Sequence, residues 1–466
     1  MTQDEYNTRA PHEGMSPGRY IATRFSSLKP PMHNVPNPIK LLRMLNSQQW
    51  AFFFIAFAAW TWDAYDFFSV SLTVTDLAET FDKTKTDITW GITLVLMFRS
   101  IGSIAFGLAA DRYGRKWPFV VNNLLFIVLE LGTGFCQTYQ QFLACRALFG
   151  VAMGGLYGNV AATALEDIPE EARGLISGML QQGYAFGYLL CTAFARGLVD
   201  TTSHGWRPLF WFGACPPVLF IVWRLMLPET QAYQERQRLR EEASADGKGK
   251  VFIKEGKVAL KHHWLLLIYL VLLMAGFNFM SHGSQDLYPT MLENQLSFSK
   301  NKVTVTQVVA NLGAMTGGTV VGFLSHVQGA WGVIPIHLME LSPGAFRTFV
   351  VGTSYQLGNL VSSASSTIEA RIGERFPLPD NAEGQSRYDY GKVICIFMAC
   401  VYGYVVVLTF GGPENLGGKF DIAHDLDARE IMGRPMDADQ YRRSGDEEKN
   451  FKRDSTEKPE VAHVRD

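Results

Sequence analysis

Residues 264–290, which read WLLLIYLVLLMAGFNFMSHGSQDLYPT, decide the class of fold that this chain can adopt. The stretch Trp264–Thr290 is long and apolar enough to be a candidate membrane span. Polar side chains follow one side of its second half at helical spacing, and they are Asn278, Ser281, His282, Gln285 and Asp286. Ionisable groups inside a membrane are expensive and usually face a cavity, and His282 and Asp286 lie one turn apart. We therefore interpret this face as one that handles a polar, proton-linked solute.

The distribution of charge places the rest of the chain in the same class. The 466 residues are 47% hydrophobic and 18% charged, and the charges crowd residues 1–48, Glu229–Lys261 and the tail after Pro413. The runs between these blocks are long, almost free of charge and without strict alternation, so in lipid they must form helices. A net charge of −2 indicates no nucleic-acid partner, and six cysteines without a CxxC pair indicate no disulfide framework or metal site. We expect an all-α membrane protein with no cofactor and no enzymatic activity.

The apolar runs give eleven candidate spans, six before a charged linker and five after it. The first six are Trp50–Leu77, Ile88–Ala110, Trp117–Cys136, Phe142–Leu165, Gly174–Val199 and Pro208–Leu227. The last five are Trp264–Leu292, Val303–Ser325, Gln328–Leu341, Phe346–Ile372 and Val393–Phe410. The predicted organisation is a cytoplasmic tail (1–48), a first half (49–228), a cytoplasmic linker (229–262), a second half (263–411) and a disordered cytoplasmic tail (412–466).

Basic residues in a short loop predict the orientation. Arg112, Arg115 and Lys116 lie between the second and third spans and mark the cytoplasmic side. The N-terminus and the linker must then lie on the same side, and both carry several Lys and Arg residues. We expect a multi-pass protein of the plasma membrane with a cytoplasmic N-terminus.

Three ionisable residues in the first two spans predict a site for a charged solute. Arg99 lies in the middle of the second span, where an arginine is costly unless it is paired or hydrated. Its planar guanidinium matches a carboxylate, so we expect it to bind substrate, with a structural ion pair as the alternative. Asp63 and Asp66 in the first span are its candidate partners and candidate proton carriers.

The loop after the second span carries a specific motif, Gly107-Leu-Ala-Ala-Asp111-Arg112-Tyr-Gly114-Arg115-Lys116. It resembles the G-x-x-x-D-R-x-G-R-K loop of the major facilitator superfamily of secondary transporters. The resemblance implies two six-helix halves that alternate in access, with these residues gating the cytoplasmic helix ends. The alternative is a generic basic loop. Arg146, in Arg146-Ala-Leu-Phe-Gly150, resembles the superfamily's R-x-x-x-G pattern, and the resemblance implies a role in conformational gating. It is expected either to pair with a buried acid or influence proton coupling, or to reach the membrane interface.

The polar stripe carries a second resemblance. The pattern Asn278-x-x-Ser281-His282-x-Ser284-Gln285-Asp286-x-x-x-Thr290 resembles a motif of the fungal monocarboxylate–proton symporters, which move lactate, pyruvate and related acids. The resemblance implies proton coupling or gating by His282 and Asp286. It implies substrate hydrogen bonds from Asn278, Ser281, Ser284, Gln285 and Thr290, and from Gln356 and Asn359 in a later span. Glu369 and Arg371 are expected at the surface, and the alternative for the stripe is interhelical hydrogen bonding.

The second half departs from the twelve-span pattern. After His326 the chain enters Val327-Gln328-Gly329, where a basic loop and a full ninth span are expected. Gln328–Leu341 is too short to cross comfortably, and an odd number of spans would invert Phe346–Phe410 unless Val303–Leu341 forms one long or re-entrant element. The function we expect is proton-coupled symport of short monocarboxylates. The alternatives are dicarboxylate or sialic-acid transport, or a non-transporting sensor or defective product; the oligomeric state is left open.

Overall fold

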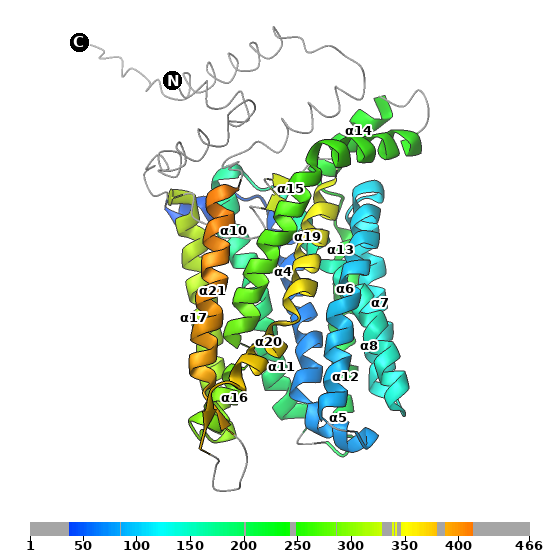
Figure 1. The fold of residues 1–466 in the computed structure, drawn as a ribbon. Helices are drawn as coiled ribbons and strands as arrows, with labels where there is room; N and C mark the ends of the chain where they lie inside the picture. The colour runs from blue at the N-terminus through cyan, green and yellow to red at the C-terminus, as the bar shows by residue number, and fades with distance from the viewer. Residues whose placement is uncertain are drawn as a thin grey trace, which may run out of the picture.

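The computed structural model is a bundle of long, roughly parallel helices (Figure 1). It describes residues 37–83, 85–199, 202–242, 248–285, 287–328, 338–339, 341–342, 346–379 and 387–412. By length and composition, six helical segments of the described chain are apolar enough to cross a membrane. They are Trp90–Tyr113, Lys116–Phe135, Tyr139–Leu165, Arg207–Met226, His263–Gln285 and Tyr390–Gly411. The expectation of an all-α membrane protein is confirmed.

The first half has six helical crossings, of which three are interrupted. After α3 (Pro38–Arg43), they are α4 (Ser47–Leu72), α6 (Lys85–Tyr113), α7 (Lys116–Phe135), α8 with α9 (Tyr139–Gly154, Leu156–Leu165), α10 with α11 (Glu170–Gln181, Gly183–Leu198) and α12 with α13 (Arg207–Gly213, Cys215–Met226). The short α5 (Val74–Phe81) connects α4 to α6. Local sequence sets the starts of α4 and α8, because Asn46 with Gln49 and Thr138 with Gln141 form capping boxes.

The second half begins with helices that the sequence analysis placed in the linker. They are α14 (Gln231–Glu242) and the first turns of α15 (Lys248–Gln285). The remaining elements are α16 (Tyr288–Thr290), η1 (Met291–Gln295), α17 (Lys300–Gln328), α19 (Arg347–Ser362), α20 (Ser365–Gly373), β1 (Pro377–Leu378), β2 (Arg387–Tyr388) and α21 (Tyr390–Gly411). β1 and β2 form a two-stranded antiparallel hairpin.

Two ends of the bundle can be distinguished in Figure 1. We call the end that carries α14 the linker end, and the end that carries α5, α16 and the β1–β2 hairpin the distal end. α17 ends, and α19 begins, at the linker end. The predicted span Gln328–Leu341 lies mostly outside the described residues. The inversion of Phe346–Phe410 is not seen, because α19 runs away from the end at which α17 finishes.

The two halves meet along α19 and α17. α19 packs against α6 and α9 of the first half, and α17 packs against α10 and α11. Within the second half, α15 packs against both α19 and α21. One buried apolar cluster continues across this boundary, from Trp60 and Tyr157 to Met274 and Val350. The halves therefore share a continuous interface, and that interface holds the site described next.

Candidate functional site

Arg99 lies in the middle of α6, buried where α6 meets the second half. Its side chain is 2% exposed, and its guanidinium carbon lies 4.8 Å from the centre of the Phe67 ring. Nη2 contacts the sulfur of Met153, and Nε has no hydrogen-bond partner among the described residues. α6 approaches α8 this closely because Gly154 lacks a side chain; a Cβ there would overlap the Arg99 carbonyl oxygen. A buried guanidinium with an unused donor is suited to a carboxylate.

Asp63 of α4 and Tyr184 of α11 are the polar neighbours of Arg99. Asp63 is 1% exposed and interacts electrostatically with Arg99, and its Oδ1 has no hydrogen-bond partner in the described part of the chain. The Tyr184 hydroxyl is within hydrogen-bonding reach of Arg99. Of the two acids expected beside Arg99, the structure places Asp63 there. An anion that arrived at Arg99 would meet this carboxylate, so protonation of Asp63 would favour anion binding.

Aromatic side chains from both halves close the region on the side of the linker end. Tyr157 of α9 stacks on Tyr355 of α19, with ring centroids 3.9 Å apart and planes at 20°. Trp60 lies 4.9 Å from Tyr157 and 5.4 Å from Tyr184, measured between ring centroids. One residue beyond the stack, a Cβ on Gly158 would lie only 2.5 Å from the carbonyl oxygen of Thr348. α9 and α19 are therefore in close contact on the linker-end side of Arg99.

The predicted donors of α19 face the same interface. The Asn359 amide donates to Gln356 Oε1 at 3.2 Å, and the Gln356 carbonyl accepts from Ser100 Oγ at 3.4 Å. The Asn278 amide of α15 donates to the Tyr355 carbonyl at 3.4 Å. Five predicted site residues therefore lie along one interface. We call them the central site: Asp63, Arg99, Asn278, Gln356 and Asn359.

The rest of the α15 stripe runs away from the central site. Ser281, Ser284 and Gln285 are exposed and His282 is half-buried. Ser284 Oγ donates to the Ser281 carbonyl at 3.0 Å within the same helix. At the helical rise per residue, the stripe extends about 10 Å from Asn278 toward the distal end. Asp286 and the side chain of Thr290 lie outside the described residues.

Glu369 of α20 is where the sequence interpretation was wrong. We expected it at the surface with Arg371, yet its side chain is fully buried, whereas the side chain of Arg371 is 76% exposed and pairs with Glu374. The physical reason is Gly283 of α15, which has no side chain and lets α20 pack closely. A Cβ at Gly283 would lie 3.2 Å from Glu369 Oε1.

Arg146 and Asp66 belong to a second buried cluster, inside the first half. Arg146 Nη1 donates to Glu130 Oε1 at 3.1 Å, and both side chains are almost fully buried. Asp66 is 0% exposed, interacts electrostatically with both, and has no hydrogen-bond partner for either oxygen among the described residues. Of the two readings for Arg146, the structure has the buried pairing. Two carboxylates therefore lie around one guanidinium in the interior of the first half.

Glu166 organises an ion cluster at the linker end. Its carboxylate accepts from Arg115 at 2.7 Å and from Arg236 of α14 at 2.8 Å, and Arg347 of α19 lies 4.0 Å away. Asp111 pairs with Arg115 at 3.2 Å. The cluster connects the loop motif to both the linker helix and the second half. Burial by itself raises the pKa of Glu166, but Arg115, Arg236 and Arg347 outweigh it and hold the pKa below its usual value.

Asp111 also caps the start of α19. Its two oxygens accept from the backbone N–H groups of Thr348 at 3.2 Å and Phe349 at 2.8 Å. The negative charge at a helix N-terminus is favourable, because it satisfies orphan donors and complements the helix dipole. Gly107 allows this approach, since a Cβ there would lie 2.7 Å from the Phe349 Cα. The motif thus joins α6 to α19 across the two halves.

The other motif residues hold the loop itself and dock α14. Gly114 has φ +95°, which favours glycine. The Arg112 carbonyl accepts from the Tyr233 hydroxyl at 2.9 Å, and Lys116 Nζ donates to the carbonyls of Leu225 and Leu227. The Arg112 side chain is exposed, and its guanidinium carbon lies 5.1 Å from the centre of the Tyr113 ring.

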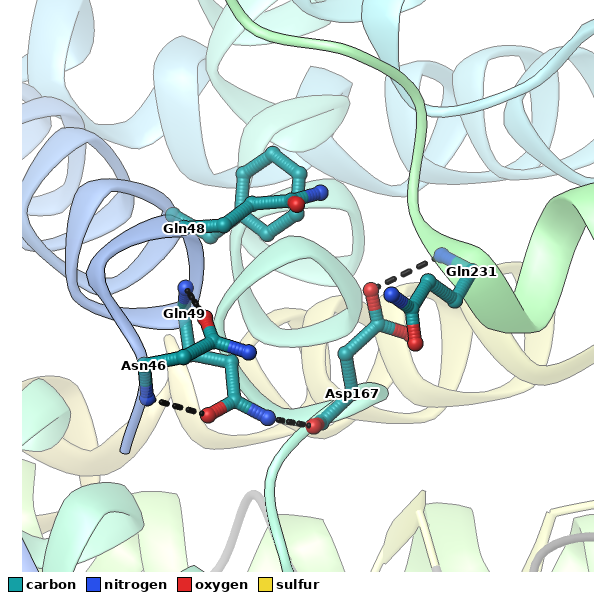
Figure 2. Close-up of a pocket in the computed structure, with 6 residues that line it drawn as sticks. Asn46, Gln48, Gln49, Asp167 and Gln231 are labelled. Atoms are coloured by element: carbon teal, nitrogen blue, oxygen red, sulfur yellow. Dashed lines mark hydrogen bonds between the residues drawn. The ribbon is translucent and has the colours of Figure 1, made fainter. Parts of the chain in front are cut away.

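A polar recess lies beside this cluster, and Figure 2 shows Asp167 at its edge, between Gln49 and Gln231. Asp167 Oδ2 accepts from the backbone N–H of Gln231 at 2.8 Å, and the Asp167 carbonyl accepts from Gln49 at 2.5 Å. Asn46 and Gln49 exchange the capping-box bonds alongside (Figure 2). The recess is a junction that ties the start of α4 to the start of α14.

Several site residues were missed by the sequence analysis. They are Trp60, Tyr157 and Tyr184 in the aromatic wall, and Glu130 and Glu166 in the two ion clusters. Glu130 could have been found, because it is an acidic residue inside a predicted span and the basic Arg146 lies in the next span. Glu166 could have been found too, because it follows a span beside several basic loop residues. The aromatic residues carried no such signal, since apolar spans are rich in such side chains.

These features define the class of the protein. A bundle of two halves with a buried polar site at their interface, and a charged cluster closing one end, is the architecture of a major facilitator superfamily transporter. A solved structure of the proton:xylose symporter XylE, a member of that superfamily, matches with a TM-score of 0.64 and 15% identity. The match covers 82% of this chain and 99% of XylE, and at this identity it shows the fold alone.

Sequence comparison identifies the family. The model of the Sugar (and other) transporter family matches residues 47–327, and the chain belongs to this family. It is a multi-pass membrane transporter and not an enzyme. The match ends beside His326, where the sequence departs from the twelve-span pattern.

The names of two related proteins describe them as transporters of carboxylic acids or their anions. The chain is 39% identical over 457 residues to a carboxylic acid transporter protein homolog of Saccharomyces cerevisiae, covering 85% of this chain and 74% of the relative. It is 26% identical over 287 residues to the cis,cis-muconate transport protein of Acinetobacter baylyi, covering 61% of this chain and 68% of that protein. The first alignment is longer than the part of this chain that it covers, so the relative contains residues that this chain lacks.

Proposed function

We propose that this protein is a proton-coupled symporter of short monocarboxylates, such as lactate and pyruvate, in the plasma membrane. The observation that carries the proposal is Arg99, a buried guanidinium with an unused donor between the two halves. A carboxylate is the anion whose geometry it matches best. The yeast relative, named as a carboxylic acid transporter homolog, supports the same class of substrate.

In the proposed binding step, the substrate carboxylate pairs with Arg99, and the amides of Gln356 and Asn359 donate to its remaining oxygens. Trp60, Tyr184 and the Tyr157–Tyr355 stack offer an apolar wall for a short carbon chain. Asp63 is released from Arg99 by taking a proton, so binding of the anion and uptake of a proton favour each other. Asp66, His282 and Asp286 are the further candidate proton carriers.

In the proposed transport step, the ion cluster at the linker end opens and the distal end closes. The linker end faces the cytoplasm in this proposal, because the loop from Arg112 to Lys116 is basic. The closed contacts of Asp111 and Glu166 hold the outward-facing or occluded state. Breaking them releases α19 from α6 and opens a path for the carboxylate to the cell interior.

The test is uptake of radiolabelled lactate at pH 5 and pH 7 in transporter-null yeast that express this chain, with surface level measured in parallel. We expect faster uptake at pH 5 that a protonophore abolishes. Absence of uptake despite normal surface level would contradict transport and favour a sensor or a defective product. If succinate or sialic acid inhibits this uptake more strongly than unlabelled lactate does, the protein is instead a dicarboxylate or sialic-acid transporter.

A further inference from the structure

Two cysteine sulfurs lie close together where α7 ends and α8 begins. Cys136 Sγ donates to Cys145 Sγ at 3.8 Å, and it also donates to the Gly132 carbonyl at 3.2 Å. A Cβ on Gly132 would lie 3.5 Å from Cys145 Sγ, so the missing side chain leaves room for the two sulfurs to meet. The two cysteines are nine positions apart, so no CxxC motif marks them. The transport cycle proposed above uses neither thiol.

The other four cysteines have different surroundings. All six lie in the described part of the chain and are free. Cys191 Sγ lies 3.4 Å from Ser69 Oγ, and Cys215, Cys395 and Cys400 are exposed. The pair between α7 and α8 is therefore the one that the structure brings together in the described part of the chain.

The pair lies at the distal end of the bundle. α7 begins at Lys116, which follows Arg115 of the ion cluster at the linker end, and it runs about 30 Å before it ends at Cys136. The next two residues, Gln137 and Thr138, are exposed. The distal end is the outer end in the proposed function. The outer surfaces of cells are oxidising, so disulfides form and persist there.

Cys145 is the thiol that a small oxidant reaches first. It is half-buried, whereas Cys136 is 3% exposed and packs in an apolar cluster with Phe142 and Trp206. The Arg207 guanidinium donates to the Cys136 carbonyl at 3.3 Å and places a positive charge beside the pair. A nearby cation favours the thiolate, which is the reactive form of cysteine.

We propose that Cys136 and Cys145 form a disulfide, driven by peroxide, that fastens α7 to α8 at the outer end of the first half. Cys145 Sγ attacks hydrogen peroxide, breaks its O–O bond, releases one water and becomes a sulfenic acid. Cys136 Sγ then attacks the sulfenic sulfur, and a second water leaves as the S–S bond forms. Two S–H bonds and one O–O bond break, and the two electrons that the thiols lose reduce the peroxide to water. The inference rests on the orientation in the proposed function and adds a covalent modification to it.

The modification needs little rearrangement. A disulfide holds its sulfurs about 2 Å apart, so the pair must close by roughly 2 Å. Cys136 caps the end of α7, with no further helical turn beyond it, so rotation of its side chain can supply this closure. α7 and α8 pack against each other within one half, so the bond leaves the movement of that half against the other free. It should stabilise the first half by restricting the unfolded chain.

Oxidation of the purified full chain tests the bond directly. The protein in detergent is treated with hydrogen peroxide or with dithiothreitol, its free thiols are alkylated, and its peptides are identified by mass spectrometry. We expect peroxide to yield a crosslink between Cys136 and Cys145 that dithiothreitol abolishes. Cys400→Ser, which removes an exposed thiol on α21, should keep the crosslink, and Cys136→Ser should lose it. If both thiols stay free after peroxide, or join other cysteines, the proposal is overturned.

Thermal unfolding and uptake test the fastening role. Peroxide should raise the melting temperature of the intact chain by at least about 2 °C and leave that of Cys136→Ser unchanged. Lactate uptake by the intact chain should stay within about twofold after oxidation, because the bond lies within one half and away from the central site. A loss of uptake that Cys136→Ser prevents would show that α7 and α8 move against each other during transport, and it would overturn the fastening role.

The redox state in cells separates the bond from the orientation. Thiols are trapped with N-ethylmaleimide in intact yeast before lysis, and we expect the crosslink to be present already. A pair that peroxide crosslinks in the purified protein but that is reduced in cells would overturn the outer placement that this proposal shares with the proposed function. Absence of lactate uptake by the intact chain would refute the proposed substrate, while both crosslink measurements would still decide whether the disulfide forms.

Discussion

Arg99 is the residue on which the proposed substrate chemistry depends. Hydrogen bonds to a charged group contribute about 1.5–3 kcal/mol, so Arg99→Gln should lower uptake efficiency about 10- to 100-fold. The uptake efficiency of Arg99→Lys should lie between those of the unchanged chain and of Arg99→Gln, because an ammonium keeps the charge but loses the planar arrangement of donors. Initial rates of lactate uptake against concentration measure this, with Arg371→Gln at the exposed surface as control. Unchanged efficiency in Arg99→Gln would remove Arg99 from the site.

Glu166 sets how the ion cluster responds to pH. Its pKa is lower in the folded protein than in the unfolded chain, so its contribution to stability is present above the unfolded value and is lost only as pH falls through the folded value. Glu166→Gln removes the buried carboxylate to which both Arg115 and Arg236 donate, and should cost about 3–5 kcal/mol. Thermal unfolding in detergent should show the same deficit at pH 7 and pH 5. A deficit that disappears by pH 5 would contradict the lowered pKa.

At the scale of elements, Asp111 of α6 holds α19 by capping the N-terminus of α19. Loss of such a cap costs about 1 kcal/mol, which corresponds to about a fivefold shift between closed and open states. Asp111→Ala, which removes both acceptor oxygens, should therefore expose the linker end more often. The rate at which a cysteine at position 103 reacts with a membrane-permeant thiol reagent measures the shift, in a chain whose own cysteines are replaced by serine. A rate equal to that of the Asp111 parent would show that the cap does not hold the closed state.

The contact between α6 and α19 can also be fixed covalently. A Cβ on Gly352 would lie 3.9 Å from the Ser103 Cβ, within the range that a disulfide spans. We expect Ser103→Cys with Gly352→Cys to form a disulfide that stops uptake, and a reductant to restore it. Each single variant is the control. Uptake that continues after complete crosslinking would mean that α6 and α19 do not separate during transport.

At the scale of the whole molecule, the direction in which α19 runs limits how many spans can separate α17 from α19 in a twelve-span relative. The described residues contain ten helical crossings, and α17 and α19 meet the same end of the bundle. Among the described residues there are therefore two crossings fewer than in the twelve-span pattern, which is an even difference. Two spans and their loops need about 50 residues. We expect genomic sequence between the codons for His326 and Gln328 to contain an in-frame coding stretch of about that length; directly adjacent codons would show that the shorter chain is what the gene encodes.

Much of this protein was readable from the sequence because each signal was local. The charge-free runs predicted helices in lipid, the loop from Gly107 to Lys116 and the polar stripe indicated the superfamily, and Arg99 stood out as a charge in a span. Such patterns need only helical periodicity and the cost of burying charge.

Only the tertiary structure decides which buried charged side chains interact with one another. Asp63 and Asp66 lie three residues apart, yet the packing of α4 gives one to Arg99 and the other to Glu130 and Arg146. Glu369 looked like a surface residue until the glycine at 283 let α20 approach α15. The physical reason is the same in each case: the state of a buried charge depends on groups distant in sequence, and only packing brings those groups within the few ångströms over which they interact.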